Sequence, residues 1–70
     1  MPLTMAKVGH SAIIKTIVGT EKTCKFLSSL GCTEGEEITL ISIIAGNYII
    51  SVKDSRYAID KNMAKAIDLV

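Results

Sequence analysis

Apolar and polar residues recur with two different periods along the chain, and the change of period separates strands from a helix. Ser11 to Val18 is rich in β-branched residues and lies between two glycines, which predicts a first strand. From Glu21 to Leu30 the apolar residues return at helical spacing, so a short amphipathic helix follows. Thr20 suits the N-cap of this helix, and Gly31 can adopt the left-handed conformation that ends it.

The helix is expected to pack on a core through one face. At about 100° per residue, that face carries Thr23, Cys24, Phe26, Leu27 and Leu30. The short segment before the first strand is expected to add Leu3 and Met5 to the same core.

The rest of the chain predicts further short strands with tight turns. The expected strands are Glu37–Ile44, Tyr48–Lys53, Arg56–Ile59 and Ala66–Val70, with turns at Ala45-Gly46-Asn47 and Asp54-Ser55 and a helical turn at Lys61–Ala64 capped by Asp60. The fold class is therefore all-β: a small barrel with one short α-helix inserted after the first strand and a helical turn before the last. Residues 1–70 form a single domain, and we expect the barrel to close because closure removes exposed strand edges.

Neighbouring apolar residues break the strict alternation expected of half-buried strands. The pairs are Ile13-Ile14, Leu40-Ile41, Ile43-Ile44 and Ile49-Ile50. Because so small a barrel has no second layer over its outer face, part of this apolar surface is expected to stay exposed and to mark a binding surface for a partner. The alternative is that the helix, the N-terminal segment and β-bulges cover it.

Charge and composition narrow the function. The formal net charge is +1, the eight cations are spread among seven acids, and only three residues are aromatic. Binding to nucleic acid would favour a concentrated basic surface or an aromatic platform, so we do not expect it. No apolar stretch approaches the roughly 20 residues that span a membrane, and no secretory signal pattern is present. With two free cysteines, this predicts a cytoplasmic protein without direct membrane insertion.

Catalysis and metal chemistry find little support in the motifs. The single histidine, His10, has no nucleophile and acid at a recognisable spacing, and no phosphate-binding glycine motif occurs, so an enzyme is not expected. Cys24 and Cys32 are eight positions apart, unlike the close pairs of structural zinc sites. His10 and Cys32 remain as weak metal-ligand candidates. No cofactor is required, and weak binding of Fe²⁺ or another divalent metal is the remaining option.

The order of several short motifs resembles the FeoA family, the ferrous iron transport protein A family. The resemblance starts at Met1-Pro2-Leu3-Thr4, is strongest in Leu27-Ser28-Ser29-Leu30-Gly31-Cys32-Thr33-Glu34-Gly35 followed by Ile38-x-Leu40, and extends through Gly46-Asn47 and the Lys53–Ile59 segment to Met63–Val70. Two positions depart from the family pattern. Cys32 stands where a larger apolar residue is common, and Lys25-Phe26 replaces the usual arginine before Leu27.

The resemblance implies an SH3-like barrel that acts by protein–protein interaction. It implies a cytoplasmic accessory of FeoB, the membrane ferrous iron transporter with a GTP-binding domain, and no enzyme activity. The candidate partner contacts are the helix and its exit: Lys25, Phe26, Leu27, Leu30 and Gly31.

Two alternatives remain open from the sequence. The same barrel forms the C-terminal domain of iron-dependent repressors, so a metal-responsive regulatory or dimerisation module is the second hypothesis. Apolar surface can also pair with itself, which leaves a homodimer as an option.

Overall fold

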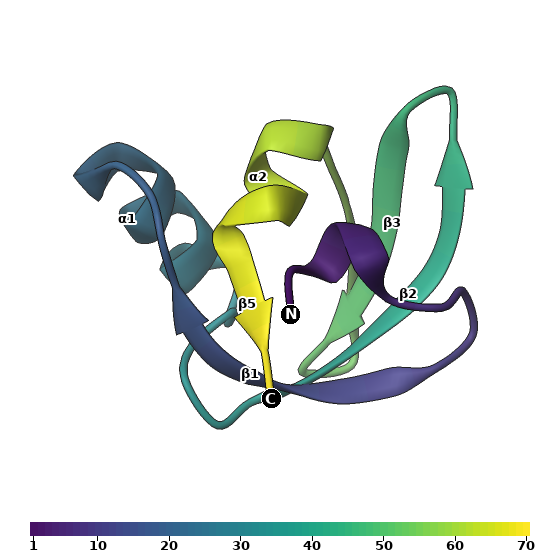
Figure 1. The fold of residues 1–70 in the computed structure, drawn as a ribbon, viewed down its shortest axis with the longest axis horizontal. Helices are drawn as coiled ribbons and strands as arrows, with labels where there is room; N and C mark the ends of the chain where they lie inside the picture. The colour runs from purple at the N-terminus through teal and green to yellow at the C-terminus, as the bar shows by residue number, and fades with distance from the viewer.

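Five antiparallel strands and two short helices make up the molecule, and the computed structural model describes all residues 1–70 (Figure 1). In chain order the elements are a 3₁₀ turn η1 (Leu3–Met5), β1 (Ser11–Ile17), α1 (Glu21–Ser29), β2 (Glu37–Ile44), β3 (Asn47–Val52), β4 (Ser55–Ile59), α2 (Lys61–Ala66) and β5 (Ile67–Leu69). The predicted fold class is confirmed, with the helix after the first strand and the helical turn before the last. Element boundaries agree with the predictions to within one or two residues.

The strands form one sheet in the order β4-β3-β2-β1-β5, with every pair antiparallel. The sheet curls around the core, but no backbone pairing joins β4 to β5, so the ring is not closed by hydrogen bonds. The expectation of full closure is therefore wrong in this detail. After β4 the chain forms α2 before it reaches β5, and this crossover separates the two ends of the sheet (Figure 1).

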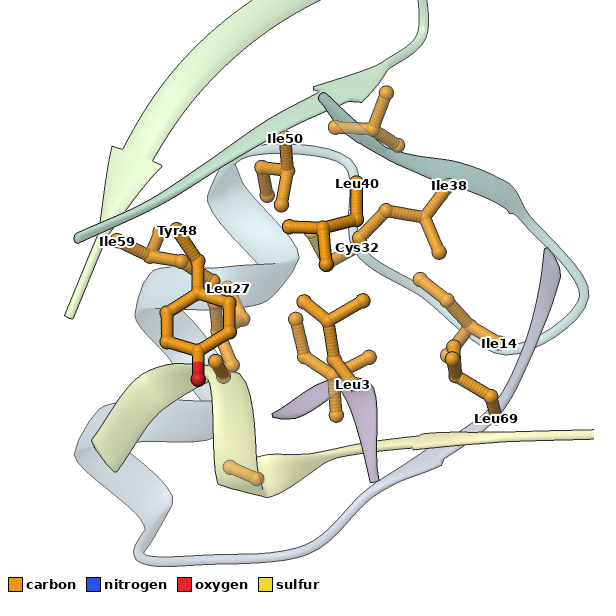
Figure 2. Packing of buried hydrophobic residues seen from close by; sticks show 14 residues of the cluster. Leu3, Ile14, Leu27, Cys32, Ile38, Leu40, Tyr48, Ile50, Ile59 and Leu69 are labelled. Atoms are coloured by element: carbon orange, nitrogen blue, oxygen red, sulfur yellow. The ribbon is translucent and has the colours of Figure 1, made fainter. Parts of the chain in front are cut away.

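Every element contributes to one buried cluster (Figure 2). Its fourteen members are Leu3, Ile14, Leu27, Cys32, Ile38, Leu40, Tyr48, Ile50, Val52, Ile59, Ala64, Ala66, Ile67 and Leu69. The cluster contains no charged side chain, and no buried side-chain nitrogen or oxygen lacks a hydrogen-bond partner. Because α1 supplies only Leu27 and β4 only Ile59, these elements depend on the shared core for their position.

A bulge in the β2–β3 pair explains one of the apolar doublets. The pairing shifts between Leu40↔Ile50 and Ser42↔Ile49, which leaves Ile41 as the extra residue. Beyond this bulge β2 leaves the core, so Ile43 and Ile44 are exposed.

The helix caps lie where the sequence predicts them. The Thr20 side chain accepts a hydrogen bond from the Thr23 N–H at 3.2 Å, and Asp60 accepts one from the Met63 N–H at 2.8 Å. Gly31 ends the helical segment with a φ of +97°. These contacts satisfy backbone donors at the start of each helix and redirect the chain after α1.

Two local predictions are wrong for geometric reasons. The left-handed residues of the first hairpin turn are Ala45-Gly46, within the predicted Ala45-Gly46-Asn47, but those of the second are Lys53-Asp54, one position before the predicted Asp54-Ser55. Met5 is 69% exposed whereas Leu3 is buried. A 3₁₀ turn rotates about 120° per residue, so side chains two positions apart point to different sides.

We predict that Gly31→Ala destabilises the fold more than Gly35→Ala. Both glycines have positive φ, but a Cβ at Gly31 would lie 2.8 Å from Lys53 Cδ, whereas nothing lies within 4 Å at Gly35. We expect losses of about 2 and about 1 kcal/mol, respectively, in the free energy of unfolding measured with urea. Lys53→Ala should reduce the cost of Gly31→Ala, and equal costs for the two glycines would contradict the close approach.

Candidate functional site

Large apolar side chains remain exposed in spite of the compact core. They are Met1, Met5, Val8, Ile13, Val18, Phe26, Ile43, Ile44 and Val70. This confirms that the chain has more apolar surface than its interior encloses. The residues do not form one patch, because α1 and the β2–β3 hairpin lie on opposite sides of the molecule (Figure 1).

The outer surface of α1 carries an exposed aromatic side chain. Phe26 is 44% exposed, although helical spacing placed it on the buried face. The core takes only Leu27 from this helix, and Phe26 lies about 100° around the axis from it. Lys25, next to Phe26, is exposed and pairs with Glu21 at 3.2 Å, an exposed i,i+4 pair of small energetic value. Phe26 and Lys25 are therefore both accessible to a partner.

The other predicted contact residues support the helix from inside. Leu27 has no exposed surface, so it cannot touch a partner and instead anchors α1 to the core. Leu30 is half-buried against the same cluster. Gly31 is covered by the aliphatic part of Lys53.

Lys53 links the helix exit to the start of β2 and the β3–β4 turn. Its Nζ lies 3.0 Å from Oε1 of Glu36, and its stem passes over Gly31. A larger residue at Gly31 would displace this stem. The C-terminal end of α1 therefore has two contacts: Leu27 packs into the core, and the Lys53 side chain covers Gly31.

A second apolar feature lies beside the N-terminal segment. A hollow of about 340 Å³ is lined by Met1, Met5, Ala6, Lys7, His10, Ser11 and Ala12. The sequence does not predict this hollow, because the pattern assigns Met5 to the core. Only the fold of η1 back toward β1 shows that these residues surround a common space.

The structure does not assemble a metal site from the predicted candidates. Cys32 is fully buried in the core, while His10 is exposed in the turn before β1. No three histidine, cysteine, aspartate or glutamate side chains gather closely enough to hold a metal ion. Burial raises the pKa of the Cys32 thiol from 9.0 to about 11, so the thiolate that a metal would need is disfavoured at neutral pH. Cys32 is thus a core residue.

Comparison with solved structures places the fold among small SH3-like domains. One crystal structure of an iron uptake regulatory protein (FeoA) has a TM-score of 0.89 and 32% identity, over 99% of this chain and 92% of that one. The Stenotrophomonas maltophilia FeoA, solved with zinc and described as an SH3 domain protein, has a TM-score of 0.88 and 20% identity, over 100% and 89%. The FeoA domain model matches residues 1–69. The chain belongs to the FeoA family, whose members are accessory proteins of ferrous iron transport.

The fold also occurs within longer proteins, among them a manganese-dependent transcriptional repressor with a TM-score of 0.90 at 15% identity, of which this chain covers 40%. The crystal structure of T. acidophilum IdeR has a TM-score of 0.89 at 22% identity, and this chain covers 33% of that one. At this identity the likeness shows the barrel alone. A search of curated protein sequences finds no match to this chain. Neither helix has the length and apolarity needed to span a membrane.

We predict that the two thiols react at very different rates. Cys24 is half-buried and Cys32 is buried, so an aromatic disulfide reagent at pH 8 should label a Cys32→Ala chain at least tenfold faster than a Cys24→Ala chain. Both should react at similar rates in denaturant. Equal rates in the folded chains would contradict the burial of Cys32.

The raised pKa of Cys32 also predicts loss of stability in alkali. The unfolded chain releases the thiol proton near pH 9, and the folded chain releases it only near pH 11. The unfolding free energy of Cys24→Ala should therefore fall, relative to the double variant that also lacks Cys32, by about 1.4 kcal/mol per pH unit in this window. Denaturant titrations between pH 8 and 11 measure it; parallel profiles would contradict the shift.

Proposed function

We propose that this chain is a cytoplasmic adaptor that docks on the cytoplasmic part of a FeoB-type transporter through the exposed surface of α1 and promotes ferrous iron uptake. The observation that carries the proposal is Phe26, an aromatic side chain 44% exposed on a helix held to the core. Membership of the FeoA family supplies the transport context.

Phe26 is suited to an interface because of its chemistry and its rigid support. Exposed aromatic residues are frequent centres of protein–protein interfaces, since they bury a large area at low entropic cost. The helix beneath it is fixed by the buried Leu27 and by the Thr20 cap. A partner that covers Phe26 therefore meets a surface that needs little reorganisation.

Charged residues around Phe26 favour a specific orientation of the partner. Lys25 and Lys22 lie on the exposed part of α1, together with Glu21. Such charges at the rim of an apolar contact act mainly on the association rate and on its dependence on salt. An acidic surface next to an apolar pocket is the complementary partner surface.

The same geometry does not favour the alternative of a metal-responsive module. That hypothesis needs His10 or Cys32 to hold a metal, and Cys32 lies in the core as a protonated thiol at neutral pH. Metal binding through these residues stays a prediction.

We predict that Phe26→Ala weakens association with full-length FeoB in detergent or nanodiscs at least tenfold, because truncation removes a central apolar contact. Ile44→Ala is the matched control, since Ile44 is also exposed but lies at the tip of the β2–β3 hairpin. It should change affinity less than twofold. Interferometry with GTP, GDP or no nucleotide, with and without Fe²⁺, gives the affinities.

Two results would count against the proposal. The first is that the wild-type chain does not associate with FeoB under any nucleotide or iron condition, which would exclude FeoB as the partner. The second is that Phe26→Ala and Ile44→Ala lower the affinity equally, which would exclude α1 as the specific docking surface. Thermal unfolding of each variant identifies losses that are due to misfolding.

A further inference from the structure

The two edge strands of the sheet, β5 and β4, differ in whether another segment of the chain covers them. The outer edge of β5 is covered by the first residues of the chain: the Leu69 N–H donates to the Met1 carbonyl at 2.6 Å, and the Met1 amine donates to the Leu69 carbonyl at 2.8 Å. Pro2 also bridges to Asp68. No backbone hydrogen bond reaches β4 from any segment other than β3. The edge of β4 is therefore the uncovered edge.

The turn before β4 determines which backbone groups face this edge. A two-residue turn, Lys53-Asp54, joins Val52 to Ser55, and these residues then form a hydrogen-bonded pair. The β3–β4 register continues without a bulge to Tyr48↔Ile59. Hydrogen-bonded positions alternate in an antiparallel pair, so the N–H and C=O groups of Arg56 and Ala58 point away from β3.

The residue after β4 extends this pattern. Asp60 has extended backbone angles, φ −79° and ψ 172°, and follows two positions after Ala58. Its N–H therefore continues the outward series of Arg56 and Ala58. Natural sheets block such edges with proline, a bulge, a covering segment, a short strand or charged side chains. The strand β4 has none of the first three, but it is short and carries Arg56.

We propose that a second copy of this chain pairs with this edge, β4 against β4, in an antiparallel register with the two-fold axis at Ala58. Each outward residue then meets an outward residue of the second copy. Ala58 meets its own copy at the axis, where a small side chain is easily accommodated. Arg56 meets Asp60 of the second copy, so opposite charges face each other on both sides of the axis.

Charge selects this register over its neighbours. A pairing centred on Arg56 would place two arginines opposite each other, and one centred on Tyr57 would bring Asp54 opposite Asp60 of the second copy. Arg56 and Asp60 are exposed and form no ion pair within the chain. Asp60 caps α2 with Oδ1 alone, which leaves its second oxygen free.

The expected dimer is weak. The contact consists of one short strand, a few backbone hydrogen bonds and two exposed ion pairs, well below the area of a stable interface. We expect a dissociation constant of about 0.1–1 mM and weakening at high salt, because exposed charges are screened.

The test combines sedimentation equilibrium with amide NMR of the chain alone from 20 μM to 2 mM. The expected result is a monomer–dimer equilibrium in which the amides of Arg56, Ala58 and Asp60 shift and gain hydrogen-exchange protection as concentration rises. A wild-type chain that stays monomeric at 2 mM overturns the proposal. A dimer with its shifts elsewhere, or an edge that pairs only with an added extended peptide, overturns it as well.

Two matched variants isolate the backbone contact. Ala58→Pro removes an outward N–H that β3 does not use, so the fold should persist while dimerisation weakens at least tenfold. Ala58→Val keeps the N–H and should change dimerisation less than threefold. Equal dimerisation of the two variants overturns the proposal.

Two charge variants test the register separately. Arg56→Glu should weaken the dimer at least threefold, since it places two acids together. Asp60→Asn can still cap α2, and it should remove most of the salt dependence. An unchanged dimer in both variants overturns the register. All of these measurements use the chain without FeoB, so their outcome is independent of the proposed docking.

Discussion

The structure depends on one enclosed cluster of fourteen side chains that receives at least one member from every helix and strand. A chain of this length buries only about 60% of the surface that its unfolded form exposes, a smaller share than in larger domains. No element is therefore stable by itself, and each is fixed where its apolar side chain reaches the common core. Leu27 shows this most clearly, because it is the single residue by which α1 is buried. The β-strands satisfy one another's backbone groups around the same cluster. The position of each helix and strand is therefore fixed by its contact with the core and not by its local secondary-structure propensity.

The same limit on core size explains the exposed apolar surface and the way the chain can act. Once the fourteen positions are filled, Phe26 on α1 and Ile43 and Ile44 beyond the β2 bulge have no interior left to occupy. Water contact with such groups is unfavourable, and a partner that covers them gains that free energy. Under the proposed function, that partner is the iron transporter and α1 supplies the docking surface. The buried, protonated Cys32 belongs to the core in the same account.

Much of the fold could be predicted from the sequence, because caps, turns and strand bounds are determined by residues that are close together in the chain. The Thr20 and Asp60 caps, the glycine after α1 and the β2 strand bounds are consequences of nearby residues. Contacts between distant segments could not be predicted in this way. Helical spacing grouped Phe26 with Leu27, but the width of the core decides which of them is buried. The cover on β5 and the open edge of β4 likewise depend on contacts between distant segments. The expectation of closure rested on short strands, tight turns and the removal of exposed edges, none of which shows where the chain ends meet the sheet.

The candidate partner contacts remain a prediction, and the structure adds only which of them are accessible. The helix and its exit were identified by resemblance, but only the structure separates the accessible Lys25 and Phe26 from the buried Leu27. Under the proposed function, the transporter covers the surplus apolar surface near α1. Solvent paramagnetic relaxation of side-chain methyl groups, recorded with and without FeoB, tests it most directly. In the free chain, we expect rapid relaxation of the exposed methyl groups of Val18, Ile43 and Ile44 and slow relaxation of those of the buried Ile38 and Ile50. In the complex, FeoB should protect Val18, which precedes α1, and leave Ile44 exposed. Uniform protection of all isoleucines in the free chain, or no methyl protected at saturating FeoB, would contradict the account.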